Sequence, residues 1–93
     1  MEDKELLIKI RNPDTRNYGF NLLVREYQKR VYWHARKMVI DHDDADDITQ
    51  EVFIKIHKSI DGFREDAQLY TWIYRIATNE CLSFLQRKKR RFF

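Results

Sequence analysis

Glycine and proline are scarce in this chain, which has two glycines and one proline among its 93 residues. All-β domains need many tight turns, and most tight turns use one of these two residues. The scarcity therefore favours long helices joined by few loops. A chain of this length forms one domain at most, with a single modest core.

Apolar residues recur at spacings of three and four, the pattern of one face of an α-helix. The sequence predicts long helices over about residues 17–40, 45–60 and 69–89, and a short helix over residues 3–10. Pro13 should separate the first two helices. Asp43 or Asp44 should cap the next helix, and Gly62 should end it in a left-handed conformation. The predicted fold class is all-α, a small bundle of three long helices plus a short N-terminal helix.

The charges are distributed unevenly along the chain. Six carboxylates and no Lys or Arg lie between Asp41 and Glu51, whereas residues 87–91, RKKRR, are five consecutive cations. The net charge is +3, and it would be negative without that run. One face should therefore be acidic and one end basic. This asymmetry suits two partners of different kinds, with nucleic acid a candidate for one of them.

Catalytic and metal-binding motifs find little support. The two glycines lie too far apart to form a phosphate-binding loop, and the serines lack the context of a nucleophile, so we expect no enzyme. Cys81 is the only cysteine, which excludes an internal disulfide and a cysteine-based zinc site. We expect it to be a buried, reduced thiol. His34, His42 and His57 are expected to have ordinary structural or surface roles.

No segment approaches the roughly 20 apolar residues of a membrane span. The first residues, MEDKELLIKI, do not resemble a signal peptide, because they are acidic and their apolar run is short. We therefore expect a cytoplasmic protein with no membrane insertion.

The acidic segment opens the second long helix. Asp47, Gln50, Glu51 and Ile54 lie at offsets that place them on one outward face. Two interpretations are open. In the first, the acids do no more than complement the helix dipole; in the second, the face docks a helix that carries arginines. A calcium loop is rejected, because the position that needs glycine is Asp46. No metal site is predicted.

The third long helix carries Tyr70, Trp72, Tyr74, Arg75 and Asn79 ahead of the basic run. Aromatic rings can stack on unpaired bases while Arg and Asn bond base edges, and the cations can pair with phosphates. The alternatives are that Trp72 is a core residue and that the basic run is a solvated tail.

Two segments in the same order resemble a known family. DADDITQEVFIKIHKSI, residues 44–60, resembles the region 2.2 helix of sigma factors, and FREDAQLYTWIYRIATNECLSFLQRKKRR, residues 63–91, resembles regions 2.3 and 2.4 of extracytoplasmic-function (ECF) sigma factors. Residues 20–39 are similar to region 2.1. The chain is therefore identified as region 2 of an ECF sigma factor of the sigma-70 superfamily, a bacterial cytoplasmic protein.

The resemblance implies two partners and a site for each. Region 2 docks on a coiled coil of the β′ subunit of core RNA polymerase, and it recognises and helps to open the promoter −10 element by capturing a flipped non-template base. By position, the polymerase-binding residues are Asp46, Asp47, Gln50, Glu51, Phe53, Ile54 and His57. The DNA-binding residues are Phe63, Arg64, Tyr70, Trp72, Arg75, Asn79, Arg87, Lys88, Lys89, Arg90 and Arg91, with residues 63–70 as the pocket loop.

Departures from the wider family shape these expectations. Primary sigma factors have two adjacent aromatics for melting, but Ile73 follows Trp72 here, as in ECF members. Region 4, the helix-turn-helix domain that reads the −35 element, is absent. Because Phe92-Phe93 is an unusual ending, we interpret residues 1–93 as one region 2 domain cut from a longer protein. The alternative is an unusual lone region 2. The resemblance also implies an anti-sigma partner, and a monomer is the default.

Two rival functions stay open. The chain can be a sigma-like protein-interaction module that does not bind DNA by itself, with an incidental basic tail. A standalone double-strand-specific helix-turn-helix regulator is disfavoured, because the short turn between its recognition helices is missing.

Overall fold

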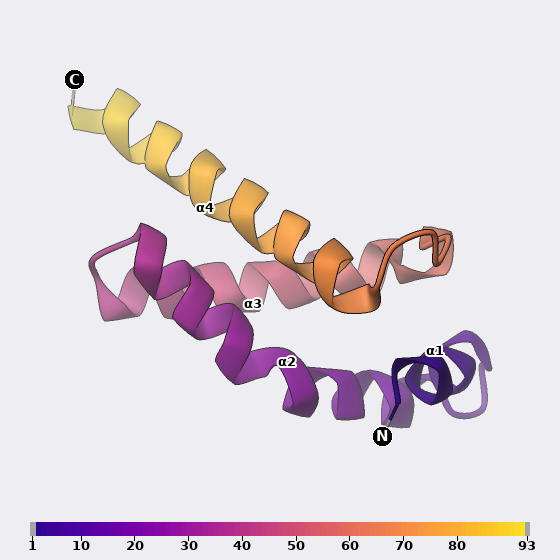
Figure 1. Ribbon diagram of the computed structural model, residues 1–93. Coiled ribbons are helices and arrows are strands. Elements are labelled where there is room, and N and C mark those ends of the chain that lie inside the picture. Colours follow the sequence, from indigo (N-terminus) through magenta and orange to yellow (C-terminus); the bar gives the residue numbers. More distant parts are fainter. Residues whose placement is uncertain (1, 93) are drawn as a thin grey trace.

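The computed structural model describes residues 2–92, with side chains for residues 2–91, and these residues form helices and connecting loops without a strand. The elements are α1 (Asp3–Arg11), α2 (Arg16–Met38), α3 (His42–Ser59), the 3₁₀ helix η1 (Ile60–Gly62) and α4 (Leu69–Phe92). This confirms the all-α prediction of three long helices after a short one (Figure 1). Phe93, on which the expectation of a cut chain partly rests, lies outside the described residues.

Four-residue repeats form the core where α2, α3 and α4 meet. Each long helix contributes a row of buried apolar residues, most of them one turn apart: Leu23, Tyr27, Val31 and Ala35 from α2, Ala45, Ile48, Val52 and Ile56 from α3, and Leu69, Ile73, Ala77 and Cys81 from α4. Helix α3 also buries Phe53. Full burial of one Leu or Ile side chain contributes about 1.5–3 kcal/mol. Cys81 is fully buried as predicted, and burial raises the pKa of its thiol.

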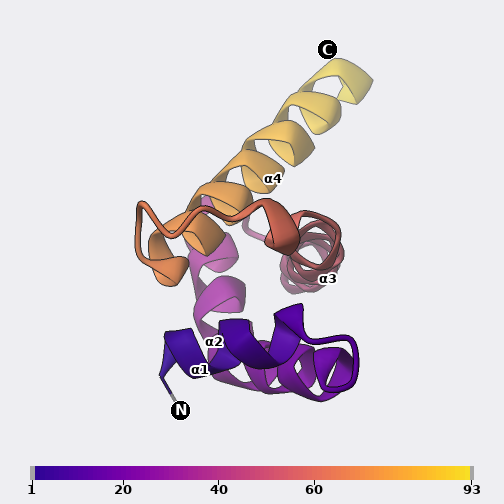
Figure 2. The ribbon, with the colours of Figure 1, turned by 90° about the vertical axis from the view of Figure 1, so that its right-hand side faces the viewer.

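Helices α2, α3 and α4 pack on one another, and the C-terminal end of α4 extends beyond the other two. In Figure 1 the yellow end of α4 projects beyond α2 and α3, and Figure 2 shows the same projection from the side. The molecule is accordingly elongated, with principal extents of 47 × 22 × 20 Å. Within the described residues, no helix has the length and apolar character needed to cross a lipid bilayer.

Two predicted helix ends were wrong. Asp41, not Asp43 or Asp44, caps α3, because its side chain accepts from the Asp43 backbone N–H at 2.7 Å. Helix α3 therefore begins at His42, a few residues before the predicted start. Gly62 ends η1 without a positive φ, since Glu65 at φ 60° is the residue that takes the left-handed conformation among those described.

Helix α1 packs on the start of α2 through a close approach at Gly19. A Cβ on Gly19 would lie 2.8 Å from the Cβ of Lys9 and 3.0 Å from the backbone N of Ile10. The Tyr27 hydroxyl donates to Asp3 at 2.7 Å, and Thr15 donates to the Lys9 carbonyl at 2.7 Å. The small residue therefore lets α1 sit directly against α2.

His34 of α2 bridges to α4. Its ring stacks on Tyr74 with centroids 4.3 Å apart, and its Nε2 lies 2.8 Å from the Thr78 hydroxyl. Burial, with a smaller effect of Lys37, holds the pKa of His34 below its usual range. The folded protein therefore resists protonation at this position more than the unfolded chain does.

We predict that Gly19→Ala destabilises the domain by about 1–3 kcal/mol through overpacking, although alanine is the better helix former by about 1 kcal/mol. Gly62→Ala is the matched control, because nothing lies within 4 Å of its would-be Cβ and its φ is not positive. Urea unfolding followed by circular dichroism measures both. Equal stabilities of the two variants would refute a close approach at Gly19.

We also predict that stability falls as the pH is lowered through about 6.5, where the unfolded His34 gains its proton. Because the folded pKa is lowered, this contribution is present above that pH and is lost below it. His34→Gln should flatten the decline in urea midpoint between about pH 7.5 and pH 5.5. His57→Gln, which removes an exposed histidine, is the control, and an unchanged slope in His34→Gln would contradict the assignment.

Candidate functional site

One shallow pocket lies on the first half of α4. Its lining residues come from two neighbouring rows of the helix: Tyr70, Tyr74 and Thr78 in one row and Thr71, Arg75 and Asn79 in the other. Thr71, Arg75 and Asn79 are exposed, so their polar groups are accessible from solvent. The structure thus brings together Tyr70, Arg75 and Asn79, three of the residues predicted to bind DNA.

The aromatic wall of this pocket is supported from α2. The rings of Tyr70 and Tyr74 lie 4.3 Å apart, and Tyr27 lies 6.1 Å from Tyr70. The Arg30 guanidinium stands over both Tyr27 and Tyr70, at 5.5 and 5.3 Å from their centroids. A hydrogen bond with Tyr74 raises the pKa of the Tyr70 hydroxyl. These contacts hold the rings in fixed orientations.

The predicted residues Phe63 and Trp72 lie elsewhere. Phe63 is buried, and its ring packs at 5.0 Å from that of Trp72, which is itself half-buried against the core. The Phe63 ring therefore supports the loop from inside, and its assignment as a DNA contact stays a prediction. Arg64, next to it, is exposed.

The basic run continues α4 as a helix, with all five side chains exposed. Successive helical residues turn by about 100°, so the five side chains point to several sides of the helix. Arg87, Lys88 and Arg91 share a hollow with Phe84 and Asp44. Lys88 lies 3.9 Å from Asp44, so one of the cations already faces an acid of the same chain. Lys89 and Arg90 do not line this hollow.

The acidic face of α3 is exposed as expected. Asp47, Gln50, Glu51 and Ile54 are all accessible, with Ile54 at 47 % exposure. Asp46 is half-buried and pairs with His42 at 3.3 Å, an i,i+4 contact that gives this histidine a carboxylate partner. The other nitrogen of the same ring meets the Tyr32 hydroxyl.

A largely apolar groove runs beside this face, between α2 and α3. It is lined by four predicted residues, Gln50, Phe53, Ile54 and His57, and by Phe20, Val24, Gln28, Thr49 and Lys58. Phe53 forms part of its buried floor, and the ring of Phe20 meets that of His57 edge-on at 4.8 Å. The α2 residues were missed because Phe20 and Val24 belong to the same helical repeat of apolar residues as the core residues of α2. Their half exposure distinguishes them.

His42, Asp43 and Asp46 form one exposed cluster whose ligand atoms lie within 4.8 Å of one another. Both ring nitrogens of His42 already have partners, and acids at the start of a helix complement its dipole. The cluster therefore has a structural explanation at the entrance to α3.

Besides Lys88 and Asp44, a second ion pair connects α3 with α4. Lys55 donates to Glu80, whose side chain is 6 % exposed. A buried carboxylate is costly unless it is paired. The ammonium group of Lys55 compensates the charge of Glu80 and so allows this carboxylate to be buried. Glu80 directly follows the pocket residue Asn79.

The chain is similar to known proteins over most of its length. The family Sigma-70 region 2 matches residues 23–91. The RNA polymerase sigma-H factor of Pseudomonas aeruginosa is 37 % identical over 97 % of this chain and 46 % of its own length. The ECF RNA polymerase sigma-E factor of Escherichia coli is 37 % identical over 98 % of this chain and 46 % of its own.

A solved structure is also similar. The NMR structure of an engineered region 2 of sigmaE in complex with GTAAAA superposes with a TM-score of 0.86 and 33 % identity, over 98 % of this chain and 93 % of that one. The chain spans about half the length of the curated relatives above. The chain therefore belongs to the sigma-70 region 2 family, with ECF sigma factors among its relatives.

Proposed function

We propose that this domain joins core RNA polymerase through the β′ coiled coil and reads the −10 element of a promoter by capturing a flipped non-template base. The observation that carries the proposal is the pocket on α4, where Tyr70, Arg75 and Asn79 converge in a member of this family. The similar solved region 2 is in complex with GTAAAA, which supports DNA as a partner of this domain.

The pocket has the chemistry that an unpaired base needs. Tyrosine rings provide stacking surfaces, and stacking of one base contributes about 1–3 kcal/mol. The Asn79 amide both donates and accepts, so it can match the edge of a base. Arg75 adds a donor fork without an acceptor and suits a carbonyl or a phosphate. Arg64, in the loop that precedes α4, adds an exposed cation.

The groove between α2 and α3 suits a helix. An amphipathic helix can lay its apolar side on Phe20, Val24 and Ile54 while its arginines reach Asp47 and Glu51. An apolar groove with an acidic edge fits one helix of the β′ coiled coil as the occupant. An anti-sigma factor that covered this groove or the α4 pocket would block one of the two partners.

The rival function is a protein-interaction module that does not bind DNA by itself. One observation favours it: Lys88 faces Asp44, so part of the basic run is compensated within the chain. The salt dependence separates the two functions, because each phosphate contact on a single strand lowers the logarithm of affinity by about 0.7 per tenfold rise in salt.

We predict that Asn79→Ala lowers the preference of the 93-residue chain for a labelled single strand containing GTAAAA over a scrambled strand by about 1–3 kcal/mol, the cost of one lost base contact. Fluorescence anisotropy at two salt concentrations measures it. Gln86→Ala, at an exposed position of α4 outside the pocket, is the control and should leave the preference unchanged. An Asn79→Ala variant that still discriminates as well as the original chain would count against the pocket.

We further predict that Asp47→Ala with Glu51→Ala removes binding to a peptide or fragment of the β′ coiled coil, because truncation leaves the arginines of the partner unpaired, at a cost of about 2–5 kcal/mol. Isothermal calorimetry measures the loss. Glu5→Ala with Glu26→Ala changes the net charge equally at two other exposed positions and should bind normally. Retained binding by the Asp47/Glu51 variant, with an unchanged circular dichroism spectrum, would refute this face.

A further inference from the structure

We propose that Arg11 and Arg16, at the corner between α1 and α2, are positioning residues that hold the loop after η1 in the form that reads the promoter base. The inference rests on the proposed function for its biological meaning. The contacts themselves join segments more than 40 positions apart in the sequence. Both residues lie before residue 23, where the family match begins.

The loop at residues 63–68 needs an external support. It lies between η1 and α4 and forms no helix or strand. Glu65 adopts φ 60°, a left-handed conformation that a residue with a Cβ takes only where its surroundings hold it. The Phe63 backbone N–H donates to the Ile60 carbonyl at 3.1 Å, which fixes the start of the loop but not its middle.

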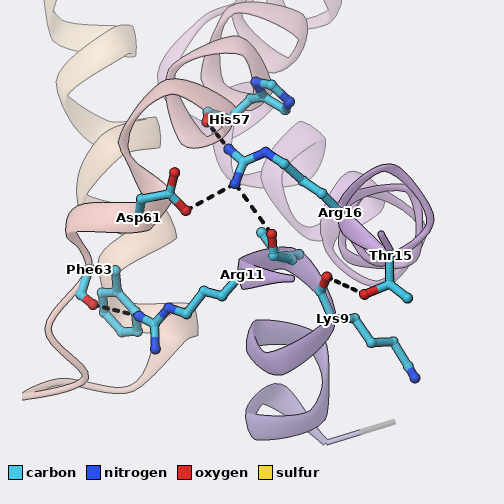
Figure 3. A network of polar contacts seen from close by, with 8 residues as sticks. Lys9, Arg11, Thr15, Arg16, His57, Asp61 and Phe63 are labelled. Carbon is cyan, nitrogen blue, oxygen red and sulfur yellow. Dashed lines mark hydrogen bonds and ion pairs between the residues drawn. The ribbon is translucent and has the colours of Figure 1, made fainter. Parts of the chain in front are cut away.

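Arg11 supplies that support with one guanidinium. Its Nη2 donates to the Phe63 carbonyl at 2.8 Å, and its Nη1 donates to the Glu65 carboxylate at 3.0 Å. One bond reaches the backbone of Phe63 and the other the side chain of Glu65, so Arg11 contacts the residues on both sides of Arg64. Figure 3 shows the Arg11 side chain extending from the end of α1 to the Phe63 carbonyl.

Arg16 connects the segments on either side of the Arg11 contacts, which together we call the arginine clamp. Its Nη1 donates to Asp61 at 2.9 Å and to the Ile10 carbonyl at 3.3 Å, and its Nη2 donates to the His57 carbonyl at 3.1 Å. One side chain thus joins the last turns of α1 and α3 to η1, as the dashed lines around Arg16 show (Figure 3). Cations near helix C-termini also interact favourably with the helix dipole.

These contacts serve loop geometry better than they serve global stability. The side chains of Arg11 and Glu65 are 37 % and 45 % exposed, and ion pairs at such positions contribute little to folding. Ordering a loop before it binds, however, removes a cost that binding would otherwise carry. The expected phenotype is therefore lost discrimination between bases, with the fold retained.

The test compares Arg11→Met with Arg25→Met, which removes an equal charge at an exposed position of α2. Backbone ¹⁵N relaxation should show residues 63–66 becoming mobile only in Arg11→Met. The preference for GTAAAA over a scrambled strand should fall by about 2- to 10-fold, the range expected when a loop must be ordered on binding, while affinity for the scrambled strand stays the same.

Glu65→Gly is a second variant for the case in which Arg11→Met does not fold. Glycine accepts the left-handed backbone without strain, so this variant should remain folded while it loses the carboxylate that Arg11 holds, and it should show the same loss of preference. An ordered loop, or an unchanged preference in a folded variant, overturns the inference.

If Asn79→Ala loses its preference for GTAAAA and these variants keep it, the role of the arginine clamp is refuted and the proposed function stands. If the original chain has no preference, the proposed function fails, and the relaxation data still decide whether Arg11 orders the loop.

Discussion

The packing of α4 against α2 and α3 is the contact on which both candidate surfaces depend. Leu69, Ile73, Ala77 and Cys81 repeat every four residues and are buried along one stripe of α4. The pocket residues belong to the same helix turns, so their positions follow from the same packing. A helix seated by interdigitated side chains cannot rotate without opening the core. The core stripe therefore sets the direction in which Arg75 and Asn79 face solvent.

The ion pair between Lys55 and Glu80 adds a polar constraint to this apolar contact. Glu80 is 5 % exposed and lies between the pocket residue Asn79 and the buried Cys81. Apolar burial has no preferred direction, whereas a buried carboxylate must keep its partner. The pair thus fixes the register of α4 along α3. Because α3 also carries the acidic face, the two proposed binding surfaces are held in one relative position.

Local patterns in the sequence predicted the helices well and predicted the joints between them poorly. The four-residue stripes determine where α2, α3 and α4 run, because helical periodicity is a property of the chain itself. The cap at Asp41 was missed because several acids in a row could each serve. The burial of Phe63 depends on Trp72, and the clamp depends on Arg11 meeting a carbonyl 52 positions away. Such contacts follow only from the tertiary structure. The α2 side of the groove was missed for the same reason, since half-buried and fully buried residues share one stripe.

The pocket and the basic run lie on different parts of α4, so base selectivity and overall DNA affinity can depend on different residues. Arg75 and Arg87 are twelve positions apart, a rise of about 18 Å along a helix, which equals about five base steps of duplex DNA. In the proposed function, a strand whose base enters the pocket therefore meets the basic run several nucleotides away. The pocket sits on the packed body, where rigid rings can discriminate. The basic run sits on the projecting end, where cations that point to several sides suit a contact independent of sequence. Selectivity should thus depend on the packed half of the helix, and salt-sensitive affinity on the projecting half.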